Sequence, residues 1–243
     1  MAGKGNNNSN KMAIKISLEE LLEAGAHYGH QAKRWNPKMS PYLYGVQEGV
    51  HVFDLVKTKE ALEEALGVLK DTISEGKIVL LLGTKKQIKD KIIEIGQETG
   101  CPYVSERWLG GTLTNFDQMK RSLDKLADMK SKMAAGEYKK FTKKERLLIE
   151  REITRLERFF GGITTLEKTP DLIFIVDTHK EIAAVKEANR AKIKIVGVVD
   201  SNADPSLIDY PIPMNDDATK ALEYVLNLIK EAILEGKKSK NKK

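Results

Sequence analysis

Cysteine is almost absent from this chain of 243 residues, in which Cys101 is the single example. An internal disulfide framework is therefore excluded, and a reducing cytoplasm is the compartment that fits best. Long apolar runs are missing too: no stretch of about 18 apolar residues occurs, so we expect no membrane-spanning helix. The N-terminal segment lacks the apolar core of a secretion signal, which argues against export.

Phosphate-binding signatures are also missing. Residues 83–86 (Gly-Thr-Lys-Lys) join an expected strand to an expected helix, which is where doubly wound proteins bind phosphates. Neither the dinucleotide-binding fingerprint nor the P-loop pattern is present there. An enzyme with a nucleotide site is thus a minor alternative, and a simple phosphate contact by Lys85 or Lys86 is the other hypothesis.

Metal and catalytic sets are not evident either. His27 and His30 lie three residues apart, but no second pair of ligands follows at a convincing spacing. Residues 200–205 imitate the start of a calcium loop, yet Pro205 stands at the sixth position, where glycine is needed. We therefore expect a tight turn there, capped by its own Asp and Asn side chains. The sequence predicts no cofactor, no metal site and no enzyme activity.

The charge of the chain is unevenly distributed. A net charge of +6 and an isoelectric point of about 9.1 favour an anionic partner. Residues 114–160 hold thirteen Lys and Arg against eight Asp and Glu, residues 236–243 hold five Lys and no acid, and the rest is mildly acidic. Positive charge gathered on appendages, and not in a cleft of the body, is typical of contact with a large polyanion.

Short apolar runs alternate with amphipathic segments through most of the chain. Near-continuous apolar strands separated by helices indicate a parallel sheet that is covered on both faces. The expected fold class is therefore α/β, a Rossmann-like parallel sheet flanked by helices. Strands are expected at 50–54, 77–83, 102–105, 171–177, 193–199 and 210–213, and helices at 57–74, 86–99, 180–191 and 217–235.

Residues 114–160 break this rhythm and contain no strand-like run. Apolar residues recur there at spacings of three and four in two stretches, separated by Gly136 and by a capping pattern at 142–145. We expect an inserted antiparallel coiled-coil α-hairpin, whose arms of roughly 20 residues project about 30 Å. The glycine pairs at 110–111 and 161–162 would let the chain turn where the hairpin leaves the body.

The chain is thus expected to have four parts. Residues 1–12 form a polar, Asn-rich leader that we expect to be disordered, and residues 236–243 form a basic tail with the same expectation. Between them, 13–113 and 161–235 are the expected α/β body, and 114–160 is the hairpin insertion.

Cations mixed with aromatic residues mark the candidate nucleic-acid contacts. The irregular segment 33–38 combines Lys, Arg and Trp, a mixture that grips phosphates and stacks on bases, although a packed loop with solvated lysines explains it equally well. Charged helix faces are usually only solvated, so the net positive excess of the hairpin is what favours RNA there. The candidate RNA-binding residues are Lys33, Arg34, Trp35, Lys38, Lys85, Lys86, Arg107, Lys120, Arg121, Lys139, Lys140, Lys143 and Lys144.

Several segments resemble, in order, the bacterial small-subunit ribosomal protein S-two family across about residues 16–236. Separate signatures in one order make a chance match very improbable. The segments that carry the resemblance are 26–31 (AHYGHQ), 35–39 (WNPKM), 107–115 (RWLGGTLTN), 147–162, 170–171, 186–189 (KEAN), 200–205 (DSNADP), 213 and 215–218 (NDDA).

The resemblance implies a Rossmann-like body with a protruding coiled-coil hairpin. It implies a structural constituent of the small (30S) ribosomal subunit that binds 16S ribosomal RNA in translation. It also implies neighbouring ribosomal proteins as partners, including the large mRNA-binding protein S-one, with no small-molecule substrate, no membrane and a cytoplasmic location. A coiled-coil adaptor that binds no RNA is the remaining alternative to this interpretation and to the nucleotide-binding enzyme.

Overall fold

The computed structural model describes residues 14–240, so the expected leader at 1–12 lies outside the described residues. A five-stranded sheet with the order β5-β4-β6-β7-β8 forms the centre of the molecule, and every neighbouring pair in it is parallel. Its strands are β4 (Val79–Leu82), β5 (Tyr103–Val104), β6 (Leu172–Ile175), β7 (Lys194–Val199) and β8 (Tyr210–Pro213).

The central strands are buried on both faces because their side chains are apolar without interruption. In β4 and β6 every residue is buried, and the two strands pair with Leu81 opposite Phe174 and Leu80 opposite Ile173. Leu81 and Phe174 belong to one hydrophobic core, and Leu80 and Ile173 belong to the other. The predicted α/β class with a doubly covered parallel sheet is confirmed.

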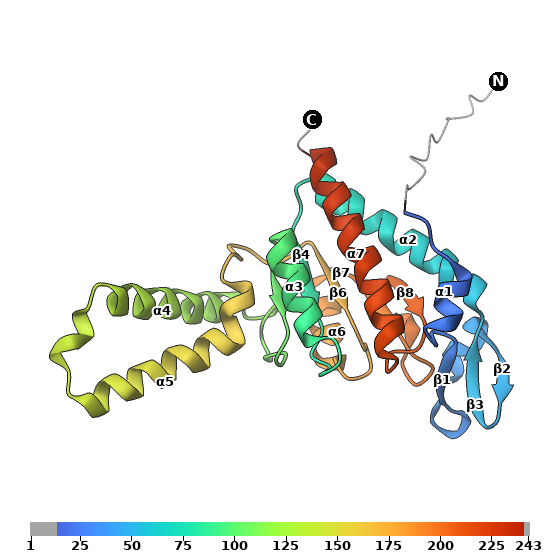
Figure 1. Cartoon of the computed structure of the whole chain (residues 1–243), viewed down its shortest axis with the longest axis horizontal. Helices are drawn as coiled ribbons and strands as arrows, with labels where there is room; N and C mark the ends of the chain where they lie inside the picture. The colour runs from blue at the N-terminus through green and yellow to red at the C-terminus, as the bar shows by residue number, and fades with distance from the viewer. Residues whose placement is uncertain (1–13, 241–243) are drawn as a thin grey trace.

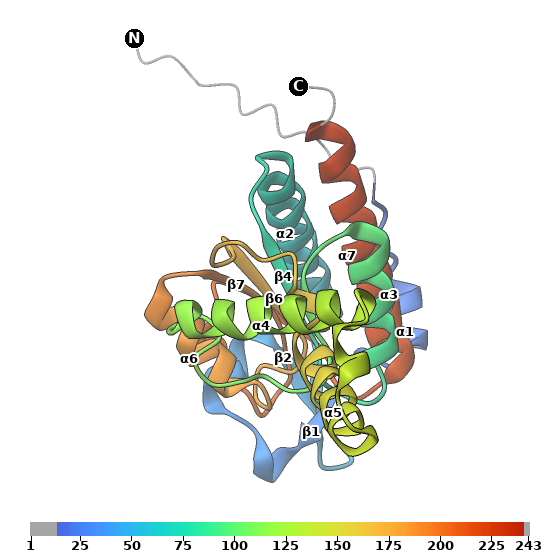
Figure 2. The same ribbon diagram turned by 90° about the vertical axis from the view of Figure 1, so that its left-hand side faces the viewer.

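Helices cover the two faces of the sheet. Helices α2, α3 and α7 lie on one side of the sheet and α6 on the other (Figures 1 and 2). Apolar side chains of α2, α3 and α7 fill one core, whereas those of α6 and of the sheet-proximal parts of α4 and α5 fill the other. The α-helices are α1 (Leu18–Glu23), α2 (Leu55–Ser74), α3 (Lys89–Thr99), α4 (Phe116–Ala134), α5 (Lys143–Phe160), α6 (Ile182–Ala191) and α7 (Thr219–Lys240). Short 3-10 turns are η1 (Ala32–Arg34), η2 (Pro37–Tyr42), η3 (Glu137–Lys140), η4 (Gly161–Ile163) and η5 (Pro205–Leu207). Among the helices of residues 14–240, none is long and apolar enough to cross a membrane.

The C-terminal segment differs from its expectation. Residues 236–240, expected to begin a disordered tail, are the last turns of α7, and 241–243 lie outside the described residues. Gly236 is buried against α2, where an added side-chain carbon would lie 2.7 Å from the backbone oxygen of Lys70. The Lys237 ammonium donates to the backbone oxygen of Thr99 at the end of α3. Cations at this place satisfy carbonyls that a helix end leaves open.

A second, antiparallel sheet corrects the expected strand arrangement. It has the order β1-β3-β2, with β1 (Tyr28–Gln31), β2 (Leu43–Gln47) and β3 (Val50–Phe53). The strand expected at 50–54 is therefore not part of the parallel sheet. In β3, residues alternate between partly exposed and buried, which is the pattern of a sheet with one solvated face. This sheet lies at the end of the molecule opposite α4 and α5 (Figure 1).

Helices α4 and α5 form an arm that projects from the body (Figure 1). The coiled-coil packing expected of this arm is not confirmed. Apolar burial is confined to its sheet-proximal part, and Figure 2 shows the two helices inclined to each other. The ion pairs Lys125–Glu152 and Lys130–Glu157 both join residues 27 positions apart. In a regular antiparallel pair of helices, a contact made by a later residue of the first helix involves an earlier residue of the second. Here both partners move five positions later in the chain, from 125 and 152 to 130 and 157.

Candidate functional site

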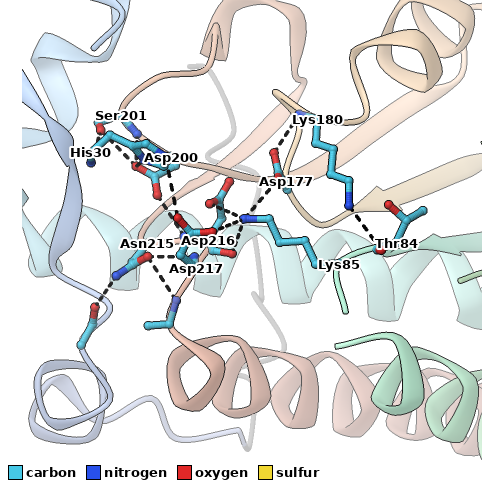
Figure 3. Close-up of polar contacts among 12 residues, drawn as sticks. His30, Thr84, Lys85, Asp177, Lys180, Asp200, Ser201, Asn215, Asp216 and Asp217 are labelled. Carbon is cyan, nitrogen blue, oxygen red and sulfur yellow. Dashed lines mark hydrogen bonds and ion pairs between the residues drawn. The ribbon is translucent and has the colours of Figure 1, made fainter. Parts of the chain in front are cut away.

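Polar side chains converge where the parallel strands end (Figure 3). Lys85 follows β4, and its ammonium lies 3.0 Å from Asp177, 2.7 Å from Asp216 and 2.7 Å from Asp217. It also donates to the backbone oxygen of Asp216 at 2.7 Å. Asp177 follows β6 and the other two aspartates follow β8, so the cluster joins three strand ends through one cation.

Burial and shared charge set the protonation of this cluster. Burial alone would lower the pKa of Lys85, but the attraction of the surrounding carboxylates outweighs it and raises that pKa. Burial raises the pKa of Asp216 to about 8, and the charges of Asp200 and Asp177 act in the same direction. The hydrogen bond from Lys85 holds the pKa of Asp217 below its ordinary value. Lys85 therefore stays charged, and Asp216 retains its proton to a higher pH than an ordinary aspartate.

His30 attaches the antiparallel sheet to the same cluster. Its Nδ1 lies 3.0 Å from Asp200, which follows β7, and its backbone N–H donates to the Ser201 hydroxyl at 2.8 Å. Asp200 in turn accepts the backbone N–H of Asp216 at 3.1 Å. The hydrogen bond with Asp200 raises the pKa of His30, although partial burial opposes it. The residue thus bridges β1 and the ends of β7 and β8.

The Lys85 ammonium already contacts three aspartates and a backbone oxygen, which leaves it little capacity for an external anion. The Lys85 ammonium occupies the edge of the sheet where α/β proteins usually bind phosphates or substrates. The predicted phosphate contact by Lys85 conflicts with this geometry, because the side chain is buried and surrounded by carboxylates. Lys86 is exposed. Within residues 14–240 no group of His, Cys, Asp or Glu is arranged to hold a metal ion.

Residues 200–205 form the tight turn that the sequence predicts. The backbone N–H of Ala203 donates to the Asp200 carbonyl at 3.0 Å, and the Asp204 carboxylate accepts the N–H of Ser206 at 3.0 Å. Asp200 and Asp204 thus cap the turn with their side chains, as predicted. The predicted cap by Asn202 is wrong, because its buried Oδ1 has no hydrogen-bond partner among the described residues.

Glu187 in α6 holds the loop from which the arm departs. Its carboxylate accepts the Trp108 indole N–H at 3.2 Å and the backbone N–H groups of Gly111 and Leu113 at 2.8 and 3.1 Å. These donors form an anion nest, which lowers the pKa of Glu187 against the opposing effect of burial. The segments 107–115 and 186–189 are separate motifs in the sequence, and their spacing does not predict this contact. The signals that could have indicated it are a carboxylate on a helix and a glycine-rich loop whose N–H groups need acceptors.

The glycine pairs at the base of the arm have unequal roles. Gly111 has a φ of +91°, a left-handed conformation that favours glycine. A side-chain carbon on Gly162 would collide with the backbone oxygen of Tyr103. By contrast, Gly110 has open space around it. One glycine of each pair therefore permits the close turn that the sequence predicted.

Apart from Lys85 and Lys86, which follow β4, the predicted site residues fall into two groups, one beside the antiparallel sheet and one on the arm and its base. Lys33, Arg34 and Lys38 are exposed on η1 and η2 beside the antiparallel sheet. Lys38 is paired with Asp204 at 2.6 Å, and the half-buried Trp35 packs on His51 with ring centroids 4.7 Å apart. Trp35 thus fills a packed loop.

The second group belongs to the arm and its base. Arg107 is exposed at the base, and Lys120 and Arg121 are exposed on α4 near the body. Four lysines cluster at the distal turn, where η3 leads into α5, and all are exposed: Lys139, Lys140, Lys143 and Lys144. These four lie between positions 139 and 144 of the chain.

The cations of the arm differ in their partners. On the stem, Lys125, Lys130 and Lys132 form ion pairs with acidic residues at 3.0, 2.6 and 2.6 Å. Arg155 and Arg158 are paired as well. In the part of the chain that the structure describes, the four distal lysines have no such carboxylate partner. The excess positive charge of the arm is therefore exposed both at its tip and along its stem, where an anionic partner can reach it. Within residues 14–240 the exposed stem cations without an ion pair are Lys120, Arg121, Arg146 and Arg151.

Comparison with known proteins decides the family. The sequence profile described as Ribosomal protein S2 matches residues 21–236, which is most of the chain. The chain belongs to the ribosomal protein S2 family.

Relatives support this membership along nearly the whole length. The chain is 48% identical over 221 residues to "Small ribosomal subunit protein uS2" of Roseiflexus sp. (strain RS-1), covering 91% of this chain and 84% of the relative. It is 46% identical over 222 residues to the protein of that name from a Nitratiruptor species, with 91% and 83% covered. The Brucella melitensis protein is 48% identical over 221 residues, with 91% and 86% covered.

Membership of the ribosomal protein S2 family bears on the sequence predictions. The resemblance stated from the motifs is confirmed, and the family is a structural, non-enzymatic one. The cluster around Lys85 is accordingly interpreted as an internal support of the body. The RNA-binding assignments of individual residues stay predictions.

Proposed function

We propose that this S2 family chain is a structural constituent of the small (30S) ribosomal subunit that binds 16S ribosomal RNA and neighbouring ribosomal proteins. Family membership across residues 21–236 is the observation that carries the proposal. Relatives nearly half identical to the chain are named as small ribosomal subunit proteins. A place on the ribosome also assigns the protein to the cytoplasm.

The mechanism that we propose is bridging. The body, 13–113 with 161–235, docks on the subunit, while the hairpin, 114–160, reaches a separate RNA element. The unpaired lysines at the distal turn support this division, because they neutralise phosphates without first breaking internal ion pairs. Lys33 and Arg34 at the opposite end extend the contact surface. Among the protein neighbours we include the large mRNA-binding protein S-one, on the strength of the sequence resemblance.

The salt dependence of binding tests this mechanism. Full-length protein is titrated against small-subunit particles depleted of it, over a range of salt concentrations. We expect tight binding that weakens with salt, because phosphate neutralisation releases counterions. The double variant Lys143→Gln/Lys144→Gln should bind more weakly, with a salt slope smaller by roughly one per lysine removed.

A matched variant controls for net charge. Lys125→Gln/Lys130→Gln removes the same charge from the stem of the arm, but from lysines already paired with glutamates. We expect its salt slope to stay close to that of the unaltered protein. Absent or salt-insensitive binding of the unaltered protein would contradict the proposal.

A further inference from the structure

Beyond phosphate contacts, we propose that the distal turn of the arm, residues 136–144, binds an unpaired RNA nucleotide by stacking its base on Phe141. This inference rests on the proposed ribosomal function and adds the form of RNA recognised at the tip. Aromatic side chains that bind single-stranded nucleic acid present part of their ring to solvent beside cationic groups. Phe141 meets both conditions.

The ring of Phe141 is held in place yet remains partly open. It lies 5.8 Å from the Tyr138 ring, centroid to centroid, at an interplanar angle of 68°, so the two rings meet edge to face. Phe141 is nevertheless 37% exposed, at the end of an arm far from the core. An edge contact fixes the orientation of a ring without covering it as a parallel stack would.

The backbone around the ring is defined on both sides. Gly136 begins the turn with a φ of +73°, and η3 follows it. Immediately after Phe141, Thr142 and Glu145 form a reciprocal capping box at the start of α5. The Thr142 N–H donates to Glu145 at 2.9 Å, and the Glu145 N–H donates to the Thr142 hydroxyl at 3.4 Å. A ring between two fixed backbone segments loses little entropy when it binds a base.

The charges around the ring favour RNA over a protein partner. The lysine pairs 139–140 and 143–144 flank Phe141 in the sequence, and the Lys140 ammonium lies over its ring, 6.0 Å from the centroid, so a base would stack on the opposite face. Within residues 14–240 these lysines have no ion pair. They therefore suit phosphates on either side of a stacked base. In an RNA duplex the base faces are covered by neighbouring pairs, so the nucleotide must be unpaired.

Substitutions of Phe141 distinguish stacking on an RNA base from packing against Tyr138. Leucine keeps an apolar side chain of similar size against Tyr138 but has no π face, whereas tryptophan keeps and enlarges that face. If Phe141 only packs the turn, Phe141→Leu should bind RNA as the unaltered protein does. If it stacks on a base, Phe141→Leu should lose affinity and Phe141→Trp should keep it.

The experiment uses full-length protein and depleted small-subunit particles, with free 16S ribosomal RNA as a second target. We expect Phe141→Leu to bind the particles roughly tenfold more weakly, with an unchanged salt slope because no cation is removed. Phe141→Trp should bind within about twofold of the unaltered protein. Circular dichroism and the thermal unfolding midpoint should be the same for all three proteins. With RNA containing 4-thiouridine, light-induced cross-links should map to the tip and decrease in Phe141→Leu.

The outcomes distinguish the two proposals. If the unaltered protein binds and Phe141→Leu binds equally well, stacking is overturned while the ribosomal function stands. Equal losses in the Leu and Trp variants would also overturn it, because they indicate a packing role. If the unaltered protein does not bind the particles, the proposed function fails and stacking fails with it.

Discussion

Lys85 is the cation that pairs with the buried carboxylates of Asp177 and Asp216, which follow β6 and β8. Removing one member of a buried ion pair leaves the other desolvated and unpaired. We therefore expect Lys85→Met to lower the free energy of unfolding by about 3–5 kcal/mol. Urea unfolding followed by circular dichroism measures this change.

The adjacent residue provides the control for Lys85. Lys86 is exposed, and Lys86→Met should change the free energy of unfolding by no more than about 0.5 kcal/mol. Equal stability of the two variants would show that the cluster does not depend on the Lys85 ammonium.

Protonation of His30 makes the free energy of unfolding depend on pH, in a direction that follows from its raised pKa. Its pKa in the folded state is raised above the ordinary 6.5 by the hydrogen bond with Asp200. Protonated His30 therefore stabilises the fold fully below about pH 6.5, and this contribution is lost as the pH rises through the higher folded-state value. The difference in unfolding free energy between the unaltered protein and His30→Gln should be largest at acidic pH and should shrink towards alkaline pH.

Two further groups must be considered in this measurement. Asp216 and Asp217 also face His30, and the pKa of Asp216 is raised by burial to about 8. Because both carboxylates interact with His30, its removal also changes their titration, and the difference therefore reports the coupled group. His179→Gln, at an exposed histidine, is measured alongside as the matched variant. A flat difference for His30→Gln would contradict the assignment.

At the scale of elements, Glu187 connects helix α6 with the loop that leads into α4. In Glu187→Gln the charge that attracts five donors is lost, and one acceptor oxygen is replaced by a donor. A hydrogen bond to a charged group contributes about 1.5–3 kcal/mol, so amide exchange at Gly111 and Leu113 should rise by roughly tenfold or more. Hydrogen exchange monitored by mass spectrometry measures this effect.

The neighbouring Lys186, exposed on the same helix, gives a matched variant. Lys186→Gln should leave exchange in the loop unchanged. If Glu187→Gln also leaves it unchanged, other contacts hold the base of the arm.

The parallel sheet could be predicted from the sequence because β4 and β6 are apolar on both faces. Strands β1 and β2 were missed because they contain Gly, His and Gln and are largely exposed. Their register also shifts where they pair with β3, so no simple alternation appears in the sequence. The last turns of α7 were missed because the lysines looked solvated, whereas Lys237 contacts the end of α3.

The candidate site could be predicted only in part. Exposed cations on a projecting arm can be recognised from charge and periodicity, and those at the distal turn lie together as a result of local sequence alone. The partners of Lys85 are up to 132 positions away, and those of Glu187 are more than 70. Such contacts depend on strand order and cannot be deduced from local spacing.

At the scale of the whole molecule, the candidate RNA contacts lie at both ends of an elongated shape (Figure 1). The distal lysines stand at one end, and Lys33 and Arg34 stand beside the antiparallel sheet at the other. The body between them is a sheet with two cores and carries no cluster arranged for metal chemistry among residues 14–240. Its part in the proposed function is to set the separation of the two ends.

That separation has a consequence for residence time. When one end of a rigid connector is bound, the other meets its target at an effective concentration in the millimolar range, provided that the span matches the distance. Two contacts of modest strength then give a long-lived attachment, since both must release together before the protein departs. We expect the length of the arm to matter as much for retention as the number of lysines that it carries.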